Sequence, residues 1–300
     1  MLSNASPDFR SGYIVIVGRP NVGKSTLFNA LVGQRLSITT PKPQTTRNNI
    51  LGILTTPGSQ MLFLDTPGLL DSRYRLQEIM RNQIQDALRD ADVLLGIVDA
   101  SNFEDTLDRE FQDTFAAAHA HRTIALNKID LISADPVDRY LNTIRATVAA
   151  DEVLPVSATT GDNLLRLRSV LEAALPPGPR YYPEDMLTEQ PERFFVSELI
   201  REELFSQLRQ EVPYAVAVQV EEFREDRPKT YIQAHIIVER NSQKGIVIGT
   251  GGKTLKSVGR NARQKIEAFL ERPVYLDLHV KVYENWRKKD TVLRGLGYLA

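Results

Sequence analysis

The 300-residue sequence contains no cysteine, a single tryptophan and only four histidines. The absence of cysteine excludes disulfide bonds and thiolate metal ligands within the chain. The histidines, at His119, His121, His235 and His279, lack the spacing of a metal-ligand set. We therefore expect a fold that depends on neither disulfides nor a thiolate metal centre.

Long apolar runs and a strong net charge are also missing. Runs such as VLLGIVDA are far shorter than the ~20 residues of a membrane-spanning helix, and MLSNASPDFRSGY lacks the basic start and apolar centre of a signal peptide. With 42% hydrophobic residues, 25% charged residues and a net charge of -1, the composition is that of a soluble globular protein. We expect a cytoplasmic protein, with peripheral association at the inner face of the cell membrane left open and no DNA partner.

The first half alternates short β-forming runs with longer helix-like segments. The runs are apolar throughout, which is typical of strands buried on both faces. This order predicts an α/β domain in which helices cover both faces of a mostly parallel sheet. The predicted strands are YIVIV (13–17), ILGIL (50–54), MLFLD (61–65), VLLGIVD (93–99), TIALN (123–127) and VLPVSA (153–158).

The alternation stops at PPGPRYYP, residues 176–183, because its four prolines break helices and strands. We predict a first domain over residues 1–178, a linker over 179–192 and a second domain over 193–300. The second half has the order helix, strand, strand, helix, helix, strand, so it is a smaller α+β domain and not a copy of the first.

Residues 18–25, GRPNVGKS, follow the first predicted strand and match the phosphate-loop pattern of P-loop proteins. Gly18 and Gly23 let the backbone curl so that its N–H groups point at a phosphate, while Lys24 neutralises charge and the Ser25 hydroxyl binds Mg²⁺. The following helix presents its positive end to the same anion. An ordinary turn also fits these letters, and the loop alone leaves ATP and GTP open.

The choice of base depends on NKID, residues 127–130, at the carboxyl end of another predicted strand. A carboxylate at Asp130 can accept hydrogen bonds from guanine N1–H and from its exocyclic amine. Adenine would leave a buried Asp130 unpaired, so the site would reject it. Asn, Lys and Asp are also common wherever a strand ends in a loop.

Two further motifs lie at strand ends. DTPG, residues 65–68, would hold Mg²⁺ through a water on Asp65 and contact the γ-phosphate through the Gly68 N–H, although Pro and Gly also form simple turns. A backbone N–H in SA, residues 157–158, can meet the guanine oxygen. The predicted GTP-binding residues are Gly18, Asn21, Val22, Gly23, Lys24, Ser25, Thr26, Asp65, Thr66, Pro67, Gly68, Asn127, Lys128, Asp130, Ser157 and Ala158.

Taken in order, these four elements resemble the GTP-binding domain of translation-factor-type GTPases. The resemblance implies a threonine that closes on Mg²⁺ when the γ-phosphate is present; in QTTRN we choose Thr46 first and Thr45 second. It also implies that Lys24 and Thr46 act in catalysis and that Ser25, Thr46 and Asp65 hold Mg²⁺.

Leu69 stands where Ras-like enzymes carry the glutamine that orients the attacking water. An alkyl side chain cannot hold a water in line. In GTPases with an apolar residue there, a phosphate-loop asparagine binds K⁺, which acts where an arginine finger would, and Asn21 is the matching position. The alternative role of Asn21 is to cap the loop turn. The resemblance thus implies slow intrinsic hydrolysis and K⁺ as a second cation.

The strongest signal of the second half is GIVIGTGGKTLKSVGRNARQK, residues 245–265. From Arg240 to Lys265 every charged residue is basic, and the spacings of three and four in its helix put several on one side. A solvated helix face would look the same. The preceding G-x-x-G turn admits a nucleic-acid backbone, and the combination resembles a type II KH domain, which binds single-stranded RNA. The predicted RNA-binding residues are Ile248, Gly249, Thr250, Gly251, Gly252, Lys253, Lys256, Arg260 and Arg263.

The stretch from Arg240 to Lys265 contains no aromatic residue. We therefore expect apolar packing of Ile246, Ile248 and Leu255 against bases in place of stacking, unless these side chains serve the core. The basic tail NWRKKDTVLRGLGYLA would either extend the RNA surface or dock as a terminal helix.

The whole sequence resembles the Era family of bacterial GTPases, including QPERFFVSELIREEL and the closing LRGLGYL. That resemblance implies binding to small-subunit (16S) ribosomal RNA near its 3′ end and a role in 30S subunit assembly. Three alternatives stay open: a GTPase of tRNA modification, an RNA-binding scaffold with a structural nucleotide and little turnover, and a P-loop kinase.

Overall fold

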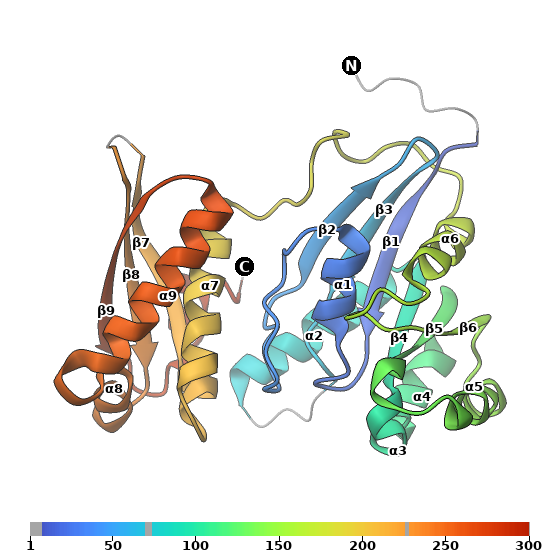
Figure 1. The fold of residues 1–300 in the computed structure, drawn as a ribbon, viewed down its shortest axis with the longest axis horizontal. Helices are drawn as coiled ribbons and strands as arrows, with labels where there is room; N and C mark the ends of the chain where they lie inside the picture. The colour runs from blue at the N-terminus through green and yellow to red at the C-terminus, as the bar shows by residue number, and fades with distance from the viewer. Residues whose placement is uncertain (1–7, 70–73, 226–227, 300) are drawn as a thin grey trace. The chain divides into compact units, whose positions relative to one another are not determined.

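The structure, a computed structural model, describes residues 8–69, 74–225 and 228–299. It comprises two compact units (Figure 1). The first spans Met1–Asp71 and Met80–Glu189, and the second spans Ser72–Ile79 and Gln190–Ala300. Each unit contains its own sheet, so each is described separately.

The first unit is built on a six-stranded sheet in the order β2-β3-β1-β4-β5-β6. Only β2 and β3 are antiparallel; all other neighbours are parallel, which confirms the predicted mostly parallel sheet. The carboxyl ends of five strands therefore meet at one edge. The strands are β1 (Arg10–Val17), β2 (Ile50–Thr55), β3 (Ser59–Asp65), β4 (Val93–Asp99), β5 (His121–Asn127) and β6 (Glu152–Pro155).

Helices cover both faces of this sheet, as predicted. One core cluster joins alternate residues of β1, such as Val15 and Val17, to Ile84 of α2, Phe111 of α4 and Ile144 of α5. Figure 1 shows α1 on the other face, in front of the sheet. The helices are α1 (Lys24–Val32), α2 (Arg75–Arg89, which belongs to this unit from Met80 on), α3 (Phe103–Thr106), α4 (Arg109–Ala117), α5 (Asp135–Thr147) and α6 (Leu164–Ala174).

The segment after α6 packs on the first unit up to Glu189. The Gln60 side chain of β3 is fully buried; its Oε1 accepts from the N–H groups of Tyr181 and Tyr182, and its Nε2 donates to Tyr182 O. The Ile53 N–H of edge strand β2 donates to Leu187 O at 2.8 Å. Part of the predicted linker is thus fixed to the sheet by hydrogen bonds.

The second unit has a three-stranded sheet in the order β7-β8-β9, with β7 antiparallel and β9 parallel to β8. Alternate β8 residues, Ile232 to Val238, pack with α7 and α9 in one core, because side chains of a strand alternate between faces. The order of elements is the one predicted. They are α7 (Glu192–Gln207), β7 (Ala217–Arg224), β8 (Thr230–Val238), α8 (Asn241–Ile248), α9 (Lys253–Leu270), β9 (Val274–Val282) and α10 (Asp290–Gly295).

The C-terminal tail docks within the second unit. Trp286 is fully buried and its Nε1 donates to Ala215 O at 2.9 Å, while Leu293 of α10 is also fully buried. Of the two roles considered for the tail, the structure favours the docked helix.

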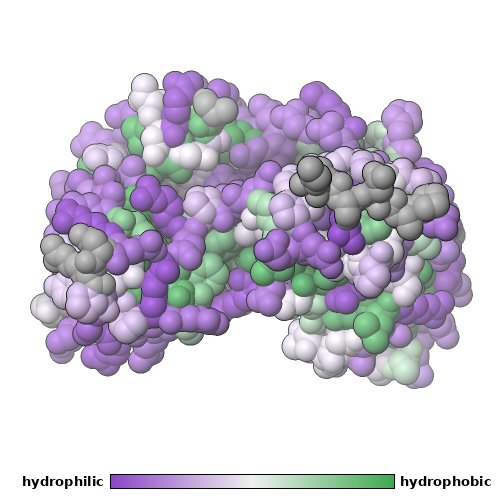
Figure 2. Space-filling view, turned by 90° about the horizontal axis from the view of Figure 1, so that it is seen from above, coloured by the Kyte–Doolittle hydropathy of each residue, from purple (hydrophilic) through white to green (hydrophobic). Residues whose placement is uncertain are grey.

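Hydrophilic side chains cover most of the face drawn in Figure 2, and the hydrophobic patches on it are small. Within the described residues, no helix combines the length and apolar character needed to cross a membrane.

Candidate functional site

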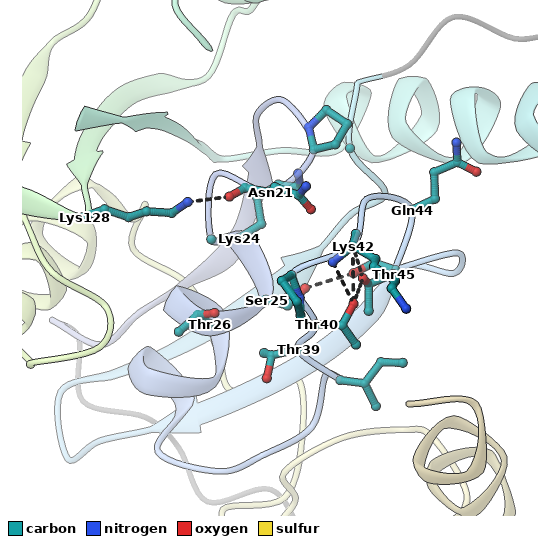
Figure 3. Close-up of a pocket in the computed structure, with 16 residues that line it drawn as sticks. Asn21, Lys24, Ser25, Thr26, Thr39, Thr40, Lys42, Gln44, Thr45 and Lys128 are labelled. Atoms are coloured by element: carbon teal, nitrogen blue, oxygen red, sulfur yellow. Dashed lines mark hydrogen bonds between the residues drawn. The ribbon is translucent and has the colours of Figure 1, made fainter. Parts of the chain in front are cut away.

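The carboxyl ends of the parallel strands in the first unit gather the predicted GTP-site motifs. GRPNVGKS follows β1, DTPG closes β3, NKID closes β5 and the SA pair follows β6. Beside them lies a pocket of about 460 Å³ that the phosphate loop and residues 38–46 enclose (Figure 3). This volume is in the range of small-molecule sites.

The phosphate loop requires glycine at position 23. Gly23 has φ 97°, a left-handed conformation, and an added Cβ would lie 2.5 Å from Asn127 Nδ2. Asn127 is almost fully buried; its Nδ2 donates to Val22 O at 2.9 Å and its Oδ1 accepts from the Ala158 N–H at 3.0 Å. Asn127 thereby ties together three motifs that lie far apart in the sequence.

Lys24 is buried within the phosphate loop. Its Nζ donates to the carbonyl oxygens of Gly18 (3.0 Å) and Arg19 (2.8 Å). Burial lowers the pKa of Lys24 from 10.5 to about 8, and the nearby Asp65 opposes that shift. An anionic phosphate would stabilise the charged form and restore a higher pKa.

Asp65, at the end of β3, is fully buried and gathers hydroxyl groups around its Oδ2. Ser25 Oγ and Ser37 Oγ donate to this oxygen at 2.8 and 2.7 Å, and Thr46 Oγ1 lies 3.3 Å away. Burial raises the pKa of Asp65, although these hydrogen bonds and Lys24 act in the other direction. Asp65 Oδ1 has no hydrogen-bond partner among the described residues.

These oxygens suit a magnesium ion. Mg²⁺ takes oxygen ligands and usually keeps several waters, with few protein ligands beside substrate phosphates. Ser25 Oγ and Thr46 Oγ1 lie 2.9 Å apart next to the unpaired oxygen of Asp65. Over the described ranges, no group of three or more His, Cys, Asp or Glu residues could hold a metal ion. With two hydroxyl groups beside one carboxylate, the arrangement fits an ion whose other ligands are phosphate and water.

The two candidate threonines have different surroundings. Thr46 is buried and lies with Ser25 and Asp65, whereas Thr45 Oγ1 bonds with Thr40 Oγ1 at 2.9 Å and donates to Lys42 O at 2.7 Å (Figure 3). This geometry supports our first choice, Thr46, as the magnesium ligand.

The residues predicted to recognise the base differ from expectation in their burial and in their hydrogen bonds. Asp130 is exposed in a 3₁₀ turn (Ile129–Leu131), so the expected burial would have to come from the bound base itself. Of the two backbone N–H groups considered for the guanine oxygen, that of Ser157 donates to Asp162 O and that of Ala158 donates to Asn127 Oδ1. Lys128 Nζ donates to Asn21 O at 2.7 Å and to Asp99 Oδ2, and thus covers the loop (Figure 3).

Leu69 and Asn21 lie in contrasting places. The Leu69 side chain is buried in the core with α2 and α4, away from the pocket. The exposed Asn21 lines the pocket and has φ 66°, a left-handed conformation that asparagine tolerates well. Both of its predicted roles, cation ligand and turn residue, agree with this position. Residues 70–73, in the loop after Gly68 and Leu69, lie outside the described residues.

Three residues at the site were missed by sequence reasoning. Ser37 donates to Asp65, Asp99 accepts from Lys128, and Arg19 binds Asp108 and Glu110 while its Nη1 donates to Leu69 O at 3.3 Å. The position of Asp99 at the end of β4 was an available signal, because ligands bind at strand ends. Ser37 and Arg19 carry no comparable signal.

In the second unit, the G-x-x-G turn connects α8 to α9. Gly249 has φ 72°, and an added Cβ would clash with Thr254 Oγ1. Gly251 and Gly252 also have positive φ, and a Cβ added at either position would have no atom within 4 Å. The turn therefore leaves room for a close-approaching backbone.

A groove of about 470 Å³ lies between α9 and edge strand β9. Of the nine predicted RNA-binding residues, Gly252, Lys256, Arg260 and Arg263 line it, and the other five lie in or beside the turn. The remaining lining residues are Leu255, Gly259, Tyr275, Leu276 and Leu278.

Of the three apolar residues expected to contact bases, Leu255 lines the groove, and Leu255 and Ile248 also pack against the core. The half-exposed Ile246 is not part of the groove lining. The three β9 residues were missed because only the parallel pairing of β9 with β8 brings that strand beside α9. Tyr275 supplies the aromatic ring that the basic stretch lacks.

Family models match both units. Residues 13–128 match the model described as 50S ribosome-binding GTPase, and residues 211–287 match the KH domain model. The GTPase Era of Geobacter metallireducens is 44% identical over 292 residues, which cover 97% of this chain and 98% of that protein. The chain belongs to the Era family of GTPases.

Two further comparisons extend this result. The GTPase ERA-like protein of Arabidopsis chloroplasts is 44% identical over 96% of this chain, which corresponds to 69% of that protein. Crystal structures of Era with MgGDPNP and nucleotides 1506–1542 of 16S ribosomal RNA, and of an Aquifex aeolicus Era variant with GDP and AlF4⁻, each match with a TM-score of 0.92 and 36% identity. Each comparison covers 97% of this chain and the whole of the other. This Era-family member therefore shares both fold and domain order with those proteins.

Proposed function

We propose that this chain is a GTP-hydrolysing switch that binds 16S ribosomal RNA near its 3′ end and assists 30S subunit assembly in the cytoplasm. The observation that carries the proposal is the convergence of the phosphate loop, the Asp65 hydroxyl cluster and NKID at one sheet edge, in a chain whose second unit is a KH domain. The matched Era complex with MgGDPNP and 16S RNA supports it.

The residues of the first unit divide the work of binding and hydrolysis. Lys24 and the loop N–H groups would bind the β- and γ-phosphates, and Ser25, Thr46 and Asp65 would hold Mg²⁺, with Asp65 acting through a water. Mg²⁺ supplies positive charge against the charge that develops on the phosphates. Asp130 would accept from guanine N1–H and the exocyclic amine, which selects GTP over ATP.

Asn21 is the proposed ligand of a potassium ion. Because Leu69 is buried and apolar, it cannot orient water, and Asn21 projects from the phosphate loop at the pocket. A monovalent cation there would supply charge beside the phosphates. We expect GTP hydrolysis by the wild type to be faster in K⁺ than in Na⁺, and Asn21→Gly, which tolerates the left-handed backbone but lacks the amide, to remove the difference. Equal wild-type rates in the two salts would remove K⁺ from the proposal.

The second unit offers the complementary features for single-stranded RNA. The exposed basic side chains of α9 would bind phosphates. Among the described residues β9 pairs only with β8, so its outer edge would present backbone N–H and C=O groups to bases. GTP would order the loop around Thr46 and the loop after Gly68, whose residues 70–73 lie outside the described structure, and so change RNA affinity.

The alternatives fit the chain less well. A GTPase of tRNA modification would not be expected to carry the KH unit, and a P-loop kinase would leave NKID without a role. A scaffold with a structural nucleotide would bind GTP tightly with no turnover. Nothing in the described surface favours the peripheral membrane association, and we do not propose it.

The central experiment measures affinity for a 16S 3′-end RNA fragment with GDPNP, with GDP and without nucleotide. We expect distinct affinities, because a ligand shifts two states only if it binds them differently. Identical affinities would refute the switch. Competition with ATP and a multiple-turnover GTPase assay in the same preparation test base specificity and separate an enzyme from a scaffold.

A further inference from the structure

Tyr275 is an exposed aromatic side chain at the rim of the RNA groove. It lies near the start of β9 and is 59% exposed, although its neighbours Leu276 and Leu278 are partly buried against the core. Among the groove-lining residues that the structure describes, it is the one aromatic. Because side chains of a strand alternate between faces, the Tyr275 ring lies on the face of the sheet opposite to Leu276 and Leu278, and it is reached from the groove across the β9 edge.

The ring of Tyr275 is held in place by its neighbour on β8. Tyr231 stacks against it with ring centroids 5.7 Å apart and planes 12° from parallel. The Arg224 guanidinium lies over Tyr231, and the Tyr231 hydroxyl donates to Asp277 at 3.4 Å. One face of the Tyr275 ring contacts Tyr231, so the opposite face accounts for much of the exposed area. The stacking on Tyr231 fixes the orientation of this opposite face, which could stack with a planar group such as a base.

We infer that Tyr275 is a stacking platform for one unpaired base of the RNA bound in this groove. The inference rests on the proposed function, since it takes the groove ligand to be single-stranded RNA. Lys256, Arg260 and Arg263 line the α9 wall and would bind phosphates, which leaves bases directed toward the β9 wall. A base that crosses the β9 edge meets the free side of Tyr275. Stacking of this kind tolerates any base, because every base has a π-face.

The competing role for Tyr275 is structural. Aromatic residues favour strands, and the Tyr231–Tyr275 pair is a cross-strand contact that stabilises the sheet. A purely structural role predicts loss of thermal stability without a base-specific effect on RNA binding. The test therefore needs a measurement that only stacking would change.

The test compares Tyr275→Ala and Tyr275→Phe in the full chain, with Tyr283→Ala as the control. Tyr283 is also exposed, at 41%, follows β9 directly and does not line the groove. The probe is a fluorescently labelled single-stranded 16S 3′-end RNA, used intact and as a set with one abasic position each. Affinity is measured by anisotropy across a salt series with GDPNP bound.

We expect Tyr275→Ala to weaken binding by roughly five- to hundredfold, the range for loss of one stacked base, with an unchanged salt slope because no phosphate contact is lost. Tyr275→Phe should bind like wild type. One abasic RNA should weaken wild type by a similar factor and add nothing to Tyr275→Ala, since the two changes remove the same contact.

Tyr275→Ala binding no worse than Tyr283→Ala would overturn the inference, and so would a loss that no abasic position shares. Failure of the proposed function looks different: wild type would not bind the RNA above a scrambled control. If wild type binds and Lys256→Ala weakens binding while Tyr275→Ala does not, only the stacking inference fails.

Discussion

The proposed GTP site and the proposed RNA groove differ in how far their polar and charged groups are buried. In the GTP site the central groups are buried: Asp65 and Asn127 are at most 1% exposed, and hydrogen bonds from separate strand ends fix them. In the RNA groove the basic residues of α9 are exposed and follow a single helix. Buried groups cannot be left unpaired without a large cost, whereas exposed phosphate contacts contribute in small, salt-dependent steps. Single substitutions should therefore disable the first site and only weaken the second.

The largest effect is expected at Asp130. Replacement by alanine removes the acceptor for two guanine donors, and a site that pairs such donors discriminates by up to about 10⁴-fold. We expect Asp130→Ala to lose most of its preference for GTP over ATP in a competition assay, whereas Asp138→Ala, on the exposed side of α5, should retain it. Asp130 is itself exposed in the structure. If Asp130→Ala reduced the preference for GTP over ATP by less than about tenfold, single substitutions at the GTP site would have effects as small as those expected at the RNA groove.

The next largest effect separates the two adjacent threonines. Thr46→Ala removes a hydroxyl beside Ser25 and Asp65, whereas Thr45→Ala removes one that bonds with Thr40 and Lys42. Loss of a group that stabilises developing charge costs about 10²–10³-fold in rate. Single-turnover GTP hydrolysis should fall by that factor in Thr46→Ala and by less than about tenfold in Thr45→Ala. The reverse order would assign the magnesium position to Thr45.

A smaller effect follows from the pKa of Lys24, which burial lowers to about 8. Above pH 8 Lys24 of the nucleotide-free protein is mostly uncharged, and it must take up a proton when phosphate binds. The affinity for GDP should therefore fall by about tenfold between pH 7 and pH 9. By the same linkage, the folded nucleotide-free protein gains stability relative to the unfolded chain between pH 8 and 10.5, because only the unfolded lysine is still charged there.

Guanosine is the control for this titration, since it shares the base with GDP but has no phosphate for Lys24. The ratio of GDP to guanosine affinity cancels any titration of guanine itself. A ratio that stays constant from pH 7 to pH 9 would show that Lys24 remains charged in the free protein.

The sequence predicted the fold because its signals are local. Apolar strands, the proline-rich break and the glycine turns each depend on a few neighbouring residues. Their order predicted a mostly parallel sheet followed by a smaller α+β domain, whose G-x-x-G turn and basic helix resemble a KH domain. The strand-end rule then placed GRPNVGKS, DTPG and NKID at one edge before any geometry was known.

What the sequence did not predict are contacts made by topology. Ser37 reaches Asp65 across 28 residues, and Tyr275 joins the groove only because β9 lies parallel beside β8. The exposure of Asp130 was missed for a different reason. A motif indicates the chemistry of a residue, whereas burial depends on what the rest of the chain, and the ligand, place over it.

The smallest expected effect tests the RNA side of the comparison. Lys256 is exposed in the groove wall, while Lys229 is also exposed but lies outside the groove lining. Removal of one phosphate contact should weaken RNA binding by a few fold for all sequences alike and reduce the slope of log K against log salt by about one. Lys229→Ala should leave both quantities unchanged. If Lys256→Ala instead abolished binding, the groove would depend on a fixed, desolvated charge as the GTP site does, and the contrast between the two regions would disappear.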